Sequence, residues 1–241
     1  MLAAAGVWPD TRVSATEHGA RDAMAVDMLL RELASASSSA ADAPTWRIVL
    51  AADGYVDQDL VAQWDADALL LTHANPQGRV PGEAAAGVLL GQAHSTSTAD
   101  ATDVHVALSP VTHRQKPADA RGAQAEPALA DLTRDLVQRA AIAPDSVIHV
   151  ISDADHRGSR PLEALNVASQ LFEHLDTAKD CHAVGVACGH TGVAASMLTL
   201  AVACEACMQS EAEPAVVTLT LQDPALRCAS LVYRPAASTT A

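Results

Sequence analysis

A histidine between glycines stands directly before a long apolar segment, in the order Gly189-His190-Thr191-Gly192. A histidine in a glycine turn ahead of a helix can present a ring N–H beside backbone N–H groups, and such donors stabilise an oxyanion. The same histidine can instead be a structural group that hydrogen-bonds to carbonyls of its own loop. We take His190 as the candidate catalytic residue and Cys188, Gly189, Thr191 and Gly192 as candidate substrate-binding residues.

All five cysteines lie in the last quarter of the chain. Cys188 could form a reactive pair with His190, although small thiols in strands are mostly inert packing residues. Cys204 and Cys207 form a C-x-x-C late in an expected helix, without a second pair or paired histidines, which indicates structural thiols rather than zinc ligands. An odd number of cysteines at irregular spacing favours reduced thiols in a cytoplasmic protein. No metal and no other cofactor is expected.

A second polar group follows an expected strand and contains His149, Asp153, Asp155 and His156. These residues could form an acid-base or metal cluster. The composition of residues 153–160 favours the alternative, a solvated turn. The remaining histidines show no pairing at ligand spacing; they are His73, His94, His105, His113, His174 and His182.

The pattern of apolar residues predicts the elements that position these groups. Apolar residues at three- and four-residue steps predict helices, and short aliphatic runs between turn residues predict strands. Residues 109–127 are expected to form a polar surface connection. Alternating helices and strands predict an α/β protein with helices covering a mixed sheet. The expected helices cover 19–33, 57–64, 128–141, 161–175 and 192–208. The expected strands cover 47–52, 103–108, 146–152, 182–188, 215–221 and 228–233, the last two as a hairpin, and residues 79–91 are expected to form a turn followed by a further strand.

Composition narrows the classes of partner. The formal net charge is −14, so nucleic acid and membrane surfaces are not expected partners, and an acidic carrier protein would be repelled unless arginines cluster locally. The apolar start of the chain lacks the basic residues of a signal peptide. Residues 181–204 are long and uncharged enough to span a bilayer, but their central glycines and His190 favour a buried strand, turn and helix.

Three segments resemble the β-ketoacyl synthases of the thiolase superfamily. The segment Val80-Pro81-Gly82-Glu83-Ala84-Ala85-Ala86 is similar to the "PGEGAA" strand of that family, preceded by Ala51 to Asp57, which resembles its strand ending in "GGxD". Pro161 to Ala164 matches the "PxEA" end of a second segment, and Gly189 to Ala195 looks like the "GHxxxAA" motif. The resemblance implies structural roles for the motif residues Pro81, Gly82, Glu83 and Glu163.

The resemblance implies a thiolase-like layered αβαβα fold with mixed sheets, of which the first half is incomplete. Residues 1–108 would be the remnant of the N-terminal half, 109–127 a connecting loop and 128–241 the C-terminal half. Either the chain is truncated, or another subunit completes its core, because a sheet without its first strands exposes an edge.

The chain departs from the family at the positions of its chemistry. No cysteine precedes Cys181, and the helix expected to present the nucleophile is preceded by Ser14, Thr16, Glu17 and His18. Ser152 stands at the position of the first catalytic histidine, and Gly185 and Ala187 stand where a lysine and an asparagine are usual.

The resemblance therefore implies a synthase-like protein of fatty-acid or polyketide-type metabolism that does not perform the condensation. Such a protein would act as a partner subunit, as a homodimer or as a heterodimer with a ketosynthase, and could meet an acyl thioester or an acyl carrier protein. The first alternative is an active acyltransferase or decarboxylase that uses His190 with a non-cysteine or partner-supplied nucleophile. A binding module that reuses the acyl pocket is the second.

Overall fold

The structure of the chain is a computed structural model that describes residues 16–17, 19, 22–37, 46–91, 104–121, 127–210 and 213–235. Its centre is a six-stranded mixed sheet in which β3, β8, β7, β5 and β6 follow one another and β4 also pairs with β8. The strands are β3 (His105–Leu108), β4 (Thr112–His113), β5 (Val147–Ser152), β6 (Cys181–Ala183), β7 (Ala215–Thr220) and β8 (Leu226–Tyr233).

Strands β7 and β8 form the predicted hairpin and lie inside this sheet. All six residues of β7 are buried, with successive side chains in opposite cores: Val216 faces one apolar cluster and Val217 the other. A strand with both faces covered needs apolar residues in succession, which explains the run Ala-Val-Val-Thr-Leu-Thr. Strand β5 pairs with β7 in parallel, so the carboxyl ends of both strands, and the loops that follow them, lie at the same end of the sheet.

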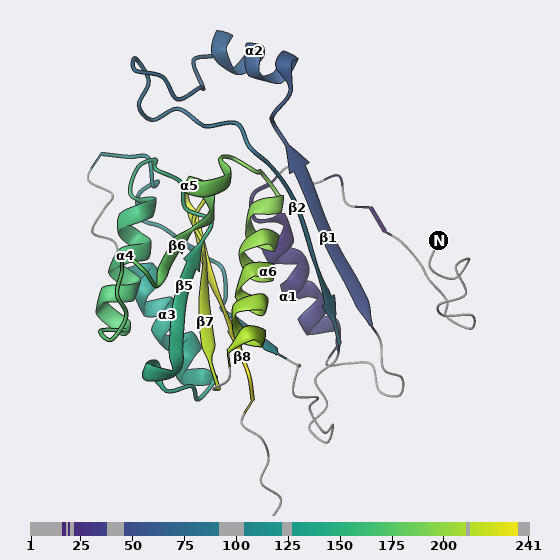
Figure 1. Cartoon of the computed structure of the whole chain (residues 1–241), viewed down its shortest axis with the longest axis vertical. Coiled ribbons are helices and arrows are strands. Elements are labelled where there is room, and N and C mark those ends of the chain that lie inside the picture. The colour runs from purple at the N-terminus through teal and green to yellow at the C-terminus, as the bar shows by residue number, and fades with distance from the viewer. Residues whose placement is uncertain are drawn as a thin grey trace, which may run out of the picture.

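Helices cover both faces of the large sheet (Figure 1). Helices α3 (Ala128–Arg139) and α4 (Arg160–Leu171) pack on one face. Helices α1 (Ala25–Ser37) and α6 (Ala194–Gln209) pack on the other. Helix α6 is apolar nearly all round because it lies between the large sheet and a second, smaller sheet.

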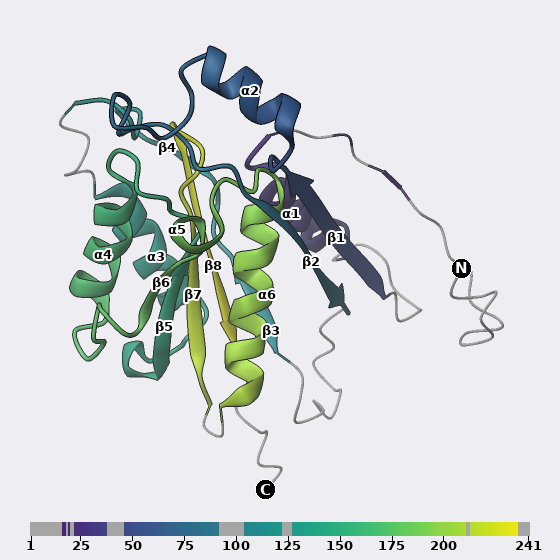
Figure 2. The same cartoon turned by 45° about the horizontal axis from the view of Figure 1, so that its top comes forward.

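The smaller sheet is an antiparallel ribbon of β1 (Arg47–Gly54) and β2 (Glu83–Leu90). Every second residue, including Val49 and Ala51 of β1 and Ala86 of β2, faces α1 and α6. Helix α2 (Gln58–Ala66) lies beyond the end of β1 (Figure 2), and the Asp57 carboxylate accepts hydrogen bonds from the N–H groups of Asp59 and Leu60 at its start.

The predicted strand over 182–188 is wrong in its second half. Strand β6 ends at Ala183, and α5 (Val184–Cys188) follows as a short helix. Gly185 lies so close to the preceding loop that a Cβ atom would be 2.5 Å from the Asp153 carbonyl oxygen. The apolar run therefore leaves the strand and forms a short helix against that loop. Over so few residues, the pattern of apolar side chains does not distinguish a strand from a helix.

The predicted surface connection over 109–127 is also only partly correct. It contains β4, which pairs with β8, and the side chains of Arg114 and Ala118 are buried. A short 3-10 helix, Pro144–Ser146, precedes β5. No helix within the described ranges is long and apolar enough to cross a membrane.

The predicted helix over 19–33 begins later, at Ala25, after the Asp22 carboxylate accepts a hydrogen bond from the Met24 N–H. Of the residues that precede it, Thr16 and Glu17 are exposed, whereas Ser14 and His18 lie outside the described residues. The apolar start of the chain, Asp103 and His94 lie outside them too.

Candidate functional site

The glycine turn that contains His190 lies against the residues just before β2. The His190 N–H donates to the Val80 carbonyl at 2.7 Å, and the Gly82 N–H donates to the His190 carbonyl at 3.2 Å. A Cβ atom on Gly82 would lie 2.0 Å from the Cys188 carbonyl oxygen, so a larger residue does not fit. The proline-glycine and glycine-histidine motifs, far apart in the sequence, are thus in direct backbone contact.

The His190 ring packs in an aromatic group that the sequence analysis did not single out. Its centroid lies 4.8 Å from that of Tyr55 and 5.7 Å from that of Trp64. The guanidinium carbon of Arg79 lies 5.7 Å from the centroid of the Trp64 ring, within the range of a cation–π contact. Aromatic residues make up only 2% of the chain, and two of them, Tyr55 and Trp64, follow soon after β1. Their closeness in the sequence could have indicated that this segment contributes to the site.

Burial lowers the pKa of His190 to about 4, and the positive charges of Arg79 and Arg157 contribute. The ring is therefore neutral at pH 7. Its Nδ1 atom is buried and has no hydrogen-bond partner within the part of the chain that the structure describes. A neutral imidazole donates one hydrogen bond and accepts one, so His190 can bind a polar group but brings no positive charge to an anion.

The start of α6, where an oxyanion site was one of the two alternatives, contains a carboxylate of the chain itself. Asp53 Oδ2 accepts hydrogen bonds from the Val193 N–H at 3.2 Å and from the Tyr55 hydroxyl at 3.1 Å. Gly192 has a φ of +50°, and a Cβ atom there would lie 2.0 Å from the same oxygen. A negative side chain is favourable at a helix N-terminus, but it competes with any anionic group of a substrate.

The segment after β5, predicted to be a solvated turn, is instead buried. Asp153 accepts hydrogen bonds from the Leu221 N–H at 2.6 Å and the Gln222 N–H at 3.3 Å. Burial raises the pKa of Asp153 to about 7, and the charge of Asp27 adds to the rise. Asp155 pairs with the buried Arg157 at 2.6 Å. Composition alone could not separate a solvated loop from a buried ionic network, because both use the same residues.

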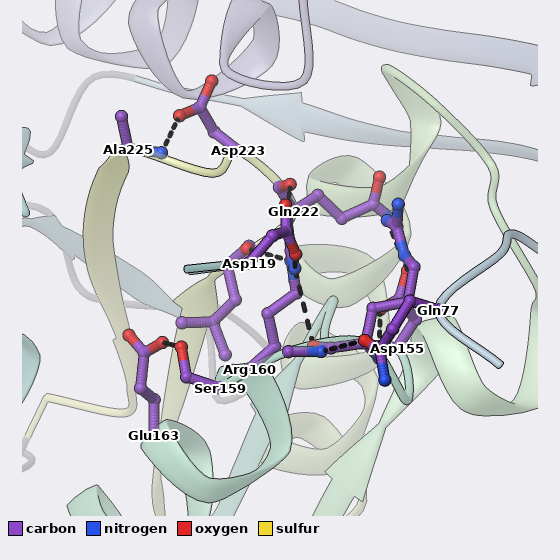
Figure 3. A network of polar contacts seen from close by, with 12 residues as sticks. Gln77, Asp119, Asp155, Ser159, Arg160, Glu163, Gln222, Asp223 and Ala225 are labelled. Carbon is purple, nitrogen blue, oxygen red and sulfur yellow. Dashed lines mark hydrogen bonds and ion pairs between the residues drawn. The ribbon is translucent and has the colours of Figure 1, made fainter. Parts of the chain in front are cut away.

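This network continues through α4 to the hairpin (Figure 3). The Arg160 guanidinium pairs with Asp119 and donates to the Leu221 and Gln222 carbonyls. Glu163 lies between the guanidinium groups of Arg114 and Arg227. Burial alone would raise the pKa of Glu163, but the hydrogen bond and charge of Arg227 lower it below its usual value.

The other candidate residues do not gather into a second centre. His149 contacts His182, with ring centroids 5.0 Å apart, whereas His156 is exposed. No group of three or more His, Cys, Asp or Glu side chains suited to a metal occurs among the described residues. The Ser152 hydroxyl is buried and donates to the His182 carbonyl at 3.5 Å, and Glu83 is exposed at the start of β2.

The thiols differ in environment. Cys188 is exposed at the end of α5, and no hydrogen bond joins it to His190 among the described residues. Burial raises the pKa of Cys204 to about 11 and that of Cys207 to about 12, and it also raises the pKa of Cys228. A raised pKa keeps these thiols protonated, so they are poor nucleophiles.

No protein-family model and no curated protein matches the chain. Solved structures do. A PfaC keto synthase–chain length factor is 17% identical over 89% of this chain and 22% of that one, with a TM-score of 0.60. The ketosynthase from module 6 of the bacillaene synthase of Bacillus subtilis 168 is 16% identical over 87% of this chain and 45% of that one, with a TM-score of 0.59.

A third match is a chain of the AntDE:AntF complex, a type II PKS acyl-carrier protein in complex with its ketosynthase. That chain is 12% identical over 78% of this chain and 56% of its own length, with a TM-score of 0.56. The predicted fold class is confirmed: the chain has a thiolase-like ketosynthase fold. It spans between about a fifth and about half of the length of these structures.

Proposed function

We propose that this ketosynthase-fold chain is a cytosolic, non-condensing subunit of an assembly in fatty-acid or polyketide-type metabolism, paired with a ketosynthase. The proposal rests on one observation above all. The Asp53 carboxylate accepts the Val193 N–H beside His190, so the chain's own negative charge lies at the start of α6. An oxyanion site needs free donors directed at the position where negative charge develops.

The environment of the three thiols on α6 and β8 supports the same function. Condensation requires a thiolate, commonly activated at a helix N-terminus. Cys204 and Cys207 lie on α6 with raised pKa values, and Cys228 lies buried in β8. Ser152 lies where the resemblance would place the first catalytic histidine, and it is buried.

The net charge of −14 suggests which subunit meets an acyl carrier protein. Like charge slows and weakens the encounter with an acidic carrier. We assign carrier docking and condensation to the ketosynthase partner, and to this chain a role in completing the assembly around the acyl group.

The competing function is an acyltransferase or decarboxylase that uses His190. It is favoured by the neutral ring and its buried, unpartnered Nδ1 atom, which could hydrogen-bond a thioester carbonyl. Asp53 argues against it, because a carboxylate beside the ring opposes charge on that carbonyl oxygen.

Two assays on the isolated chain separate these functions. The chain is incubated with acetyl- and malonyl-pantetheine thioesters, followed by intact-mass measurement of acyl adducts and by measurement of released CO₂. We expect no adduct and no CO₂ above the thioester blank. An adduct lost in Cys188→Ser, or CO₂ release lost in His190→Ala, would establish the enzymatic alternative.

A further inference from the structure

The outward face of the β1–β2 ribbon is apolar and exposed. The residues that alternate with the buried ones point away from α1 and α6, and the largest of them are Leu50, Leu89 and Ile48, whose exposed fractions are 76%, 58% and 53%. They pair across the strands with one another or with small residues: Ile48 lies opposite Leu89, Leu50 opposite Gly87 and Ala52 opposite Ala85. An apolar patch that extends across two strands indicates an interaction site.

The large sheet of the same chain shows how such a face is normally covered. Its β7 strand has α6 against Val216 on one side and α3 and α4 beyond Val217 on the other. The ribbon has α1 and α6 on its inner side, and within the described ranges no helix packs on its outer side (Figure 1). Amphipathic helices like α3 and α4 would cover the outer side of the ribbon in the same way.

The edges of the ribbon are open as well. Strands β1 and β2 pair only with each other in the part of the chain that is described, whereas β7 and β8 have β5 and β3 as further neighbours. A two-stranded ribbon is marginally stable by itself, and unpaired edges readily accept another strand.

The charge beside this face indicates the kind of partner. Helix α2 and its flanks lie beyond the Gly54 end of the ribbon, and residues 55–78 include no Lys or Arg. The acidic residues of this segment are all exposed: Asp57, Asp59, Asp65 and Asp67. A second copy would bring the same net charge of −14, so a partner with basic residues around its apolar surface is the better match.

We infer that the outer face of β1–β2 is the docking surface for amphipathic helices of the ketosynthase partner, with Lys or Arg residues of that partner facing α2. This inference rests on the proposed function, since it names the surface through which that partner binds. Leu50 lies near the centre of the face and would be covered by an apolar residue of the partner.

The test uses the full chain and each ketosynthase of the source organism, produced and purified singly. Binding is measured by titration calorimetry for the wild type, for Leu50→Asp and for Leu162→Asp. The last is a matched change of an exposed leucine on α4, which lies on the other face of the large sheet from the ribbon (Figure 1). We expect one ketosynthase to bind, Leu50→Asp to weaken its binding by roughly tenfold or more, and Leu162→Asp to leave it unchanged.

Circular dichroism verifies that each variant is folded. If Leu50→Asp does not fold, Leu50→Thr combined with Ile48→Thr replaces it, because threonine retains the preference for a strand. High salt should also weaken binding if Lys or Arg residues of the partner face α2.

The other outcomes overturn distinct claims. If no ketosynthase binds, the proposed function fails. If one binds and Leu50→Asp has no effect, the function stands and the surface is wrong. If the isolated chain is a dimer by light scattering and Leu50→Asp makes it a monomer, a second copy is the occupant. A longer form of the protein, with further residues before Met1, gives the last outcome. If Leu50→Asp unfolds the longer form but not the present chain, the further residues cover the face.

Discussion

Asp53 on β1 accepts a hydrogen bond at Oδ2 from the Val193 N–H, 3.2 Å away, directly before α6. The contact joins the ribbon to the helix that packs on the large sheet, and it places a carboxylate beside the turn of His190. Its contribution to stability can be measured.

Asp53→Asn should lower the free energy of unfolding by about 1 kcal/mol, because a neutral amide loses the favourable interaction with the helix N-terminus. Urea unfolding at low salt measures the change. Asp65→Asn, at an exposed position on α2, is the control and should change stability by less than about 0.5 kcal/mol. Equal effects of both variants would show that the contact contributes nothing specific.

Gly82→Ala should destabilise the protein by about 2 kcal/mol, because the new methyl group would overlap the Cys188 carbonyl oxygen and displace the His190 turn. Thermal and urea unfolding measure the loss. Gly54→Ala is the matched control, since its nearest neighbour would be Glu83 Cβ at 3.3 Å in an exposed position. An unchanged stability of Gly82→Ala would contradict the packing of the two motifs.

Glu163→Gln should cost roughly 4 kcal/mol, because it leaves the buried guanidinium groups of Arg114 and Arg227 without their carboxylate. Asp131→Asn removes an ion pair with Arg134 on the exposed face of α3 and should cost less than about 1 kcal/mol. Chemical unfolding of both variants gives the comparison. A small loss for Glu163→Gln would mean that solvent reaches this network.

His190 should make the protein sensitive to acid. Its pKa of about 4 lies below the ordinary value of 6.5, so its contribution to stability is complete above pH 6.5 and is lost as the pH falls towards 4. His190→Gln should remove this part of the pH dependence. NMR titration should show no change of the His190 ring between pH 8 and 5.5, and Arg79→Gln should raise its pKa by removing a like charge. A midpoint near 6.5 in the wild type would refute the burial of the ring.

Much of the secondary structure followed from the sequence alone. The strands of the ribbon and of the large sheet, the terminal hairpin and the helices α3, α4 and α6 have apolar patterns that few other structures would satisfy. The Pro81-Gly82 and His190 motifs also indicated the fold correctly, because the close backbone contacts at Gly82 and Gly189 tolerate no larger residue.

Other features depended on contacts between distant segments. The strand predicted up to Cys188 became α5 because Gly185 meets the carbonyls after β5, and the supposed solvated turn became a buried network because Arg114, Asp119 and Arg227 lie near it only after folding. The site changed for the same reason. Sequence spacing placed His190 before a helix, but only the tertiary structure brought Tyr55, Trp64 and Asp53 to it, since burial and charge at a site are properties of neighbours that the local sequence does not contain.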